Sequence, residues 1–277
     1  MTTSDQVLDQ IRILQAEGES FAIATVVRTV SMTAAKAGAK AVIGADGTLR
    51  SGWIGGGCAR GAVLRAAVAA IADGKPRLIS VQPMDALRAQ GLRPNEARDG
   101  LIFAKNMCPS QGTMDVFIEP VLPWPELLIC GAAAVALALA DLAPKFGYAV
   151  RIAAPAAARA EFPDATARLT AYEFTALAPS ERYIVVATQG TGDEAALRAA
   201  LSVTSRYVGF VGSRRKIAAI GEAMRAEGID PARLDKLHAP AGLAIDAVTP
   251  EEIALSILAE ITAIRRHQQR GPNDTPA

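Results

Sequence analysis

The sequence predicts an α/β protein of two domains, an N-terminal α+β domain followed by a Rossmann-like domain with a parallel sheet. The 277 residues are enough for two domains, each with its own core. Strand and helix patterns alternate regularly only after residue 126, and such alternation is typical of parallel sheets. Three prolines between residues 120 and 125 interrupt secondary structure at the change. We therefore expect domains at residues 1–122 and 126–270, and a disordered tail at 271–277.

The first domain mixes helices with strands that follow one another along the chain. Asp46-Gly47 predicts a hairpin between strands at 40–43 and 48–53. The stretch 83–100, with two prolines and scattered charge, indicates a helix and a surface loop. Apolar periodicity predicts helices at 7–17 and 59–73 and strands at 21–27, 77–81 and 113–121.

The second domain alternates buried strands with helices. Thr249 is a suitable N-cap for its last helix, which extends to about Arg266, and Pro250 fits the first helical position. The other elements are strands at 127–130, 148–153, 183–187 and 207–211, and helices at 133–146, 193–201 and 214–227.

Charge and composition exclude several broad classes of protein. The 29 basic and 28 acidic residues give a formal charge of +1, so no general attraction to nucleic acid or anionic membranes is expected. Three cysteines suit a reducing compartment better than a disulfide framework. The start lacks a secretory pattern, and the longest apolar run, 127–140, is too short to span a bilayer. We expect a soluble cytoplasmic protein without stable membrane insertion.

The most informative motif is Gly55-Gly56-Gly57-Cys58, which opens directly onto the helix at 59–73. Glycines let backbone amides approach a ligand closely, and a helix start favours negative charge. The same position lowers the pKa of a thiol and so favours a thiolate that can bind metal. The motif predicts a pocket for an anionic compound, with Cys58 as a sulfur or metal ligand. A tight turn with a small buried thiol explains the same residues equally well.

The other two cysteines carry less information. Cys108 lies in a loop of turn-forming residues, either as a second accessible thiol or as a packed residue. Cys130 ends an apolar strand and is expected in the core.

The first strand of the second domain carries an incomplete dinucleotide-binding fingerprint. Gly131 and Ala136 fill the first and third positions of G-x-G-x-x-G/A, but Ala133 places a β-carbon where the pyrophosphate needs glycine. The second strand ends at Ala154-Pro155 with no acid to bind a ribose hydroxyl. These departures argue against NAD(P) binding. An enzyme that uses NAD(P) or another nucleotide remains the alternative function.

A second candidate anion site follows the strand at 207–211. Gly212 and Ser213 lead into a helix that begins Arg214-Arg215-Lys216, so amides, helix dipole and cations are close in sequence. A capped helix with solvated cations is the alternative explanation. His238 is one of two histidines, and a lone histidine is more often structural than a ligand or base. The sequence contains no nucleophile elbow, zinc-ligand spacing or Walker P-loop.

In combination, these motifs resemble the XdhC/CoxI family of accessory proteins, which mature molybdenum hydroxylases such as xanthine dehydrogenase and carbon monoxide dehydrogenase. The resemblance spans most of the chain, with the motifs in the same order and spacing. It rests on Gly38-Ala39-Lys40, Asp46-Gly47, Ile54–Cys58, Cys108–Gly112, Phe117–Pro120, Val211–Lys216, Leu237–Pro240 and Thr249–Ala254.

The resemblance implies a non-catalytic carrier whose N-terminal domain handles the cofactor. Its cargo would be molybdenum cofactor (molybdopterin), held during sulfuration and insertion. Its partners would be an apo molybdenum hydroxylase and a cysteine desulfurase. The alanine-rich helices are compatible with a homodimer or with a monomer's core. Candidate cofactor-binding residues are Lys40, Gly55, Gly56, Gly57, Cys58, Gly212, Ser213, Arg214, Arg215 and His238, with Cys58 as metal contact and no catalytic residue.

Two departures from the family pattern bear on the second domain. The family's Gly-Ala-Gly-His-Val-Ala turn is Gly131–Ala136 here and lacks the histidine, and a familiar histidine pair is replaced by Thr188-Gln189-Gly190. Any metal or redox role of those histidines is therefore not expected. The stretch Val30–Ala34 resembles the branch associated with carbon monoxide dehydrogenase-type enzymes.

Overall fold

The computed structural model describes residues 3–107, 112–155, 162, 167–169, 171–175, 177 and 181–269. It divides into two compact units, Met1–Pro123 and Trp124–Ala277, and each is described by itself. The units are joined within the proline-rich stretch that the sequence suggests as a linker. Residues 271–277, expected to be disordered, lie outside the described part of the chain.

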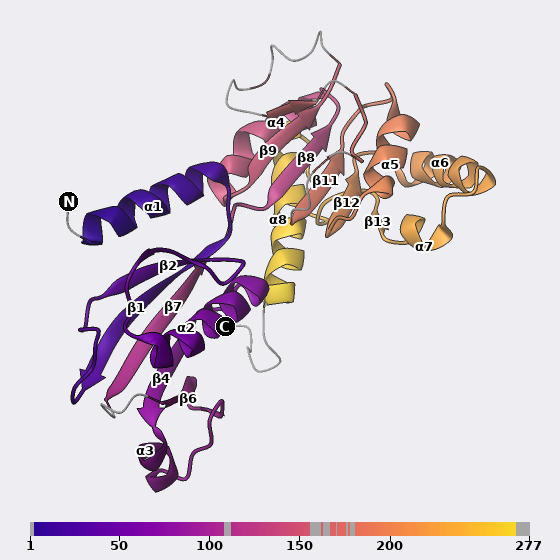
Figure 1. The fold of residues 1–277 in the computed structure, drawn as a ribbon. Coiled ribbons are helices and arrows are strands. Elements are labelled where there is room, and N and C mark those ends of the chain that lie inside the picture. Colours follow the sequence, from indigo (N-terminus) through magenta and orange to yellow (C-terminus); the bar gives the residue numbers. More distant parts are fainter. Residues whose placement is uncertain are drawn as a thin grey trace. The chain divides into compact units, whose positions relative to one another are not determined.

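The first unit is a mostly antiparallel sheet of seven strands in the order β3-β2-β1-β7-β4-β6-β5 (Figure 1). β4 and β6 form its parallel pair. The strands are β1 Phe21–Val30, β2 Lys40–Gly44, β3 Leu49–Gly52, β4 Arg77–Pro83, β5 Ala97–Arg98, β6 Leu101–Asn106 and β7 Thr113–Val121. The helices are α1 Thr3–Glu17, α2 Gly57–Asp73 and α3 Met84–Ala89.

The two faces of this sheet bury different helices, because side chains alternate along each strand. Ala22, Ala24 and Val26 of β1 share a core with α2. Phe21 points to the other face and packs with Val7 and Leu14 of α1. Helix α2 thus lies across one face of the sheet (Figure 1). Its first turn lies near Val81 of β4, Asn106 of β6 and Met114 of β7.

The second unit has a parallel six-stranded sheet in the order β10-β9-β8-β11-β12-β13. Counted along the chain this is 3-2-1-4-5-6, the strand order of dinucleotide-binding folds. The strands are β8 Glu126–Cys130, β9 Ala149–Ala153, β10 Ala167–Leu169, β11 Arg182–Val186, β12 Tyr207–Phe210 and β13 Leu237–His238. The helices are α4 Ala134–Leu142, the 3-10 helix η1 Ala143–Phe146, α5 Asp193–Ser202, α6 Arg214–Ala226, α7 Pro231–Leu234 and α8 Pro250–Gln269.

Helices cover both faces of this parallel sheet, as the alternating pattern predicts. One core cluster joins α4 and α8 to the sheet, and it includes Leu139, Tyr183 and Ile257. The cluster on the other face joins α5 and α6, and it includes Leu197, Phe210 and Met224. Cys130 is fully buried, and this burial raises the pKa of its thiol, which confirms its expected place in the core.

The fold class is confirmed, while several element boundaries differ from those the sequence suggests. The helix expected at 133–146 ends as an α-helix at Leu142 and continues as the 3-10 turn η1, because Pro144 has no amide to donate to the preceding turn. The helix expected from residue 59 begins at Gly57. The short elements β5, β6, β10, α7 and β13 were not predicted.

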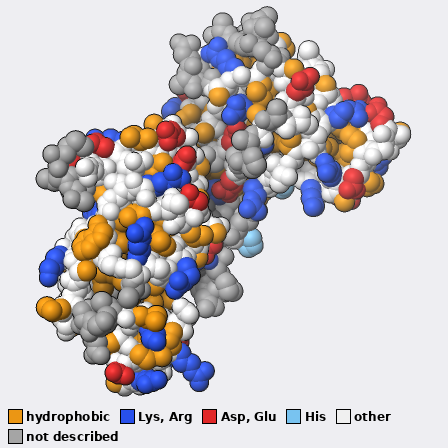
Figure 2. Space-filling model, viewed as in Figure 1, with side chains coloured by type: hydrophobic (Ala, Val, Ile, Leu, Met, Phe, Trp, Pro, Cys, Tyr) orange, Lys and Arg blue, Asp and Glu red, His pale blue; other side chains and the backbone are white. Residues whose placement is uncertain are grey.

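In the described part of the chain, no helix combines the length and the apolar character needed to cross a membrane. On the face drawn in Figure 2, Lys and Arg side chains are interspersed with Asp and Glu side chains in each unit. This surface agrees with the formal charge of +1.

We expect Gly131→Ala to destabilise the second unit far more than Gly147→Ala. Both glycines have positive φ, 108° and 78°. A β-carbon at Gly131 would lie 2.4 Å from the Ala187 carbonyl oxygen, whereas none of the surrounding atoms lies within 4 Å at Gly147. Gly147→Ala should cost about 1 kcal/mol of unfolding free energy and Gly131→Ala about 3 kcal/mol. Urea unfolding measures both, and equal losses would contradict the close approach of β8 and β11 at this edge.

Candidate functional site

The glycine turn of the first unit leads directly into helix α2. Gly55 has a φ of 107°, which a residue with a β-carbon rarely adopts. Gly56 is the N-cap in an extended conformation, and no side chain caps the helix there. The amides of a helix's first turn have no acceptor within the helix. At α2 these donors therefore need water or a ligand as their partner.

A small cavity of about 100 Å³ lies against this turn. It is small beside the roughly 300–1,000 Å³ of pockets that enclose a drug-sized ligand, so one end of a larger molecule fits. Its walls are mostly apolar side chains and glycine backbone from the loop before β2, the turn, and the ends of β4, β6 and β7. The lining residues are Met32, Thr33, Ala34, Ala35, Gly55, Gly56, Gly57, Ala59, Val81, Asn106, Gly112 and Met114.

The predicted residues around this cavity have different outcomes. Gly55, Gly56 and Gly57 line it. Cys58 is the second residue of α2, but its side chain lies outside what the structure describes, as does Cys108. The expected thiol ligand therefore stays a prediction.

Lys40, expected near the same turn, points elsewhere. Its ammonium donates to the Thr25 hydroxyl at 2.9 Å. Its neighbour Ala41 belongs to the core beneath α2, so Lys40 lies on the opposite face of the sheet. The structure does not bring Lys40 to the cavity.

Asn106 is a lining residue that sequence reasoning missed. It ends β6, a strand that was not predicted, and its side-chain amide donates to the Gly112 carbonyl at 2.7 Å. This bond ties β6 to the start of β7 at the mouth of the cavity. The signal in the sequence for this strand was the short apolar run 101–104, which is followed by Lys105 and Asn106.

The basic turn of the second unit is a capped helix start. The Ser213 hydroxyl accepts a hydrogen bond from the Lys216 amide at 3.2 Å, as expected of an N-cap. Arg214 and Arg215 are exposed. The Lys216 ammonium instead pairs with Asp193 at the start of α5. The three cations therefore do not converge on one point.

Asp193 organises the carboxyl end of β11. Its buried carboxylate accepts hydrogen bonds from the Thr188 hydroxyl, from the Gly190 amide at 3.0 Å and from Lys216. Burial opposes the charge, but the bonds from Lys216, Thr188 and Gly190 outweigh it and lower the pKa of Asp193. The segment Thr188-Gln189-Gly190, which stands in place of the family's histidine pair, is thus held by the Asp193 carboxylate.

A larger cavity, of about 400 Å³, adjoins the basic turn. Gly212 and Arg214 line it, together with the loop after β13 and the first turns of α8. Its volume is in the range of small-molecule pockets. The other lining residues are Val211, Pro240, Ala241, Gly242, Leu243, Ala244, Ile245, Asp246, Ala247, Ile253 and Ser256.

His238 belongs to a polar cluster behind that loop. The Glu260 carboxylate lies 2.8 Å from His238 Nδ1 and accepts bonds from the Tyr207 hydroxyl at 2.6 Å and the Gly242 amide at 2.8 Å. The imidazole ring also packs on Tyr207, with ring centroids 4.5 Å apart. Burial and the bond to Glu260 raise the pKa of Tyr207, so the phenol stays protonated and donates. In this cluster His238 positions the cavity wall and does not line the cavity.

Among the side chains that the structure describes, three or more His, Cys, Asp or Glu residues nowhere gather in a way that could hold a metal ion.

Two models of one family match the chain. The model described as the XdhC Rossmann domain matches residues 127–261, and that described as the XdhC and CoxI family matches residues 14–82. The chain belongs to the XdhC/CoxI family. The matched region 14–82 contains the glycine turn Gly55–Gly57. The matched region 127–261 contains the basic turn Gly212–Lys216 and Glu260.

The chain is also similar to individual proteins. The "Uncharacterized protein YqeB" of Escherichia coli strain K12 is 29% identical, over 93% of this chain and 46% of that protein. A probable xanthine dehydrogenase subunit of Bacillus subtilis strain 168 is also 29% identical, over 56% of this chain and 47% of that protein. The chain thus spans about half the length of the curated relatives it matches. A crystal structure of a xanthine dehydrogenase from Bacillus halodurans aligns over 98% of both chains, with 19% identity and a TM-score of 0.47.

We expect Asp193→Asn to make stability less dependent on pH. Because the folded-state pKa of Asp193 lies below its usual value, its charge contributes stability above that value, and this contribution is lost as pH falls through the folded-state pKa. Between about pH 6 and about pH 3 the wild-type melting temperature should therefore fall further than that of Asp193→Asn. Thermal unfolding followed by circular dichroism measures the difference, and parallel pH curves for the two proteins would refute the network.

Glu260→Ala should destabilise the second unit by about 1–3 kcal/mol, because the Tyr207 hydroxyl and the Gly242 amide, which both donate to Glu260 Oε2, lose their acceptor. The matched control is Glu251→Ala on the exposed side of the same helix, which should change the unfolding free energy by less than about 0.5 kcal/mol. Urea unfolding compares them. Similar losses of unfolding free energy in both variants would show that the Glu260 cluster does not hold the loop after β13.

Proposed function

We propose that this chain is an accessory factor that binds molybdenum cofactor and assists its insertion into a molybdenum hydroxylase of the xanthine dehydrogenase type. Membership of the XdhC/CoxI family supports the proposal, as does the relative from Bacillus subtilis that is named as part of a probable xanthine dehydrogenase. The observation that carries it is the cavity beside the uncapped first turn of α2.

The chemistry of this turn suits an anionic cargo. Molybdopterin carries a phosphate and a dithiolene-bound metal, and uncapped amides at a helix start are donors for such negative charge. Gly56 and Gly57 are exposed, and a β-carbon at either would meet open space. A flat ligand could therefore lie over the backbone while one end enters the cavity.

The cavity also suits temporary binding. Its small volume and its open mouth at Gly56 and Gly57 enclose part of a cofactor and leave the rest accessible. A carrier that hands its cargo to an apo-enzyme needs such moderate contacts. Cys58, in the first turn of α2, is our candidate for contact with the metal or its exchangeable sulfur. A cysteine desulfurase is the corresponding candidate for the sulfur donor.

Gly57→Val tests the proposal, because its β-carbon would meet open space and its methyl groups would lie over the amides and the cavity mouth. Ala69→Val, on the exposed side of the same helix, is the matched control. We expect wild type and control to retain pterin fluorescence and molybdenum through gel filtration, and Gly57→Val to bind at least tenfold more weakly. Cys58→Ala should bind with less metal and activate the client less.

Equal retention by Gly57→Val and the control would contradict binding at this turn. Equal metal content and client activation by Cys58→Ala would remove the thiol from the mechanism.

An enzyme that uses a nucleotide is the second candidate, and two observations favour it. The parallel sheet has the strand order of dinucleotide-binding folds, and a cavity of about 400 Å³ adjoins Gly212 and Arg214. This function requires saturable binding of NADP⁺ or ATP that weakens in Arg214→Gln and not in Arg215→Gln. Absence of saturable binding by calorimetry would exclude it.

A further inference from the structure

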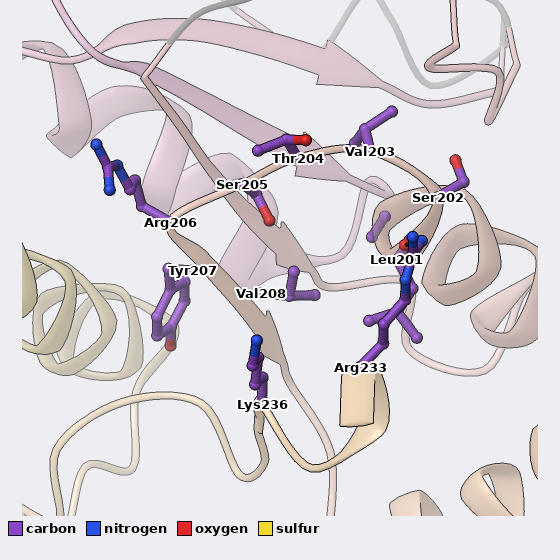
Figure 3. A pocket seen from close by; sticks show the side chains of 11 residues that line it. Leu201, Ser202, Val203, Thr204, Ser205, Arg206, Tyr207, Val208, Arg233 and Lys236 are labelled. Atoms are coloured by element: carbon purple, nitrogen blue, oxygen red, sulfur yellow. Dashed lines mark hydrogen bonds between the residues drawn. The ribbon is translucent and has the colours of Figure 1, made fainter. Parts of the chain in front are cut away.

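A polar cavity of about 280 Å³ lies at the edge of the second unit's sheet where the parallel strands begin (Figure 3). Ser202 at the end of α5 and the segment 203–206 before β12 form one wall, and Arg233 and Lys236 come from α7 and the segment before β13. Gly131, Gly212 and Arg214 follow the carboxyl ends of their strands, at the opposite edge. The cavity is therefore separate from the candidate sites described above.

Three cations line this cavity: Arg206, Arg233 and Lys236. In Figure 3 the side chains of Arg233 and Lys236 extend from their own segments toward the segment 201–208. In the part of the chain that the structure describes, none of the three is within ion-pair distance of a carboxylate. The neighbouring acids have other partners, since Asp235 faces Arg225 at 3.9 Å and Asp230 accepts from the Ala232 amide.

Arg233 is held in place before any ligand arrives. One of its terminal nitrogens donates to the Leu201 carbonyl at 2.6 Å, near the end of α5. A guanidinium has five N–H donors, so most of them remain for a ligand. Capping of α5 alone would account for Arg233. It would not account for Lys236 or for the cavity between them.

The rest of the wall also suits an anion with several oxygens. Ser202, Thr204 and Ser205 also line the cavity, next to Arg206, and of these the Ser202 hydroxyl donates to the Ala199 carbonyl at 2.8 Å. A phosphate group offers acceptors that match a planar guanidinium fork, and an ammonium binds it as a point charge. The volume is near the lower end of small-molecule pockets, which limits the organic part of a ligand to a small body.

We propose that this cavity binds the phosphate group of a small molecule, with Arg233 and Lys236 as its main ligands. The proposal is independent of cofactor carriage by the first unit. The ligand is either free phosphate or pyrophosphate, or a small phosphate ester. These sources share the same chemistry at Arg233 and Lys236 and differ in whether an organic body fills the cavity.

The test is isothermal titration of the full chain with inorganic phosphate, pyrophosphate and ribose 5-phosphate at low salt. Wild type should bind at least one of them at a single site, and added salt should weaken binding. The Arg233→Gln/Lys236→Gln variant should bind at least tenfold more weakly. Lys75→Gln/Arg93→Gln removes the same charge from exposed positions of the first unit that line none of the cavities described above, and it should stay within twofold of wild type.

Lys236→Gln alone keeps the experiment interpretable if loss of the Arg233 bond to Leu201 impairs folding. Lys236 is exposed, and its replacement should weaken binding at least threefold. Tighter binding of ribose 5-phosphate than of both inorganic anions would identify a phosphate ester as the ligand class, and the reverse would identify the free anion. No saturable binding, or equal losses in the two double variants, would overturn the proposal.

Discussion

The uncapped amides at the start of α2 are the feature on which the functional account depends. A helix start leaves donors that must find partners, and here the residues before and at the first turn are glycines that offer none. The sheet beneath α2 then supplies the rest of the cavity wall, because the ends of β4, β6 and β7 line it and Asn106 ties β6 to the residue before β7. Backbone donors, dipole and an apolar cavity are thereby combined at one point.

The Rossmann-like domain shows a different use of polar groups. At its carboxyl edge, Asp193 and Glu260 each bind several donors and so fix loops that in a dinucleotide-binding protein would face the ligand. Gly131 packs so closely on the end of β11 that no side chain fits between them. The domain keeps its strand order, while its loops are held by carboxylates of the chain itself. Fold and ligand are separable in this way because loops, and not strands, carry the binding chemistry.

The sequence was informative where local patterns decide the structure. The hairpin at Asp46-Gly47, the Ser213 cap and the alternation after residue 126 each depend on near neighbours, and the corresponding elements are present. Short strands such as β13 were missed because pairing with a distant strand, and not their own two or three residues, defines them.

Side-chain partners were equally hard to predict. Lys40 and Lys216 appear in sequence as free cations beside glycine turns. In the fold, one faces the other side of its sheet and the other pairs with Asp193. Likewise, His238 gives no sequence signal of its contact with Glu260, 22 residues away. Such contacts depend on strand register and helix packing, which local spacing does not encode.

Hydrogen–deuterium exchange with and without molybdenum cofactor tests the central claim most directly. If the first-turn amides of α2 hold the cargo, exchange at residues 57–59 slows when cofactor is added, while exchange at residues 70–73 of the same helix stays unchanged. Unchanged exchange at residues 57–59 in a sample that has bound cofactor would contradict the account.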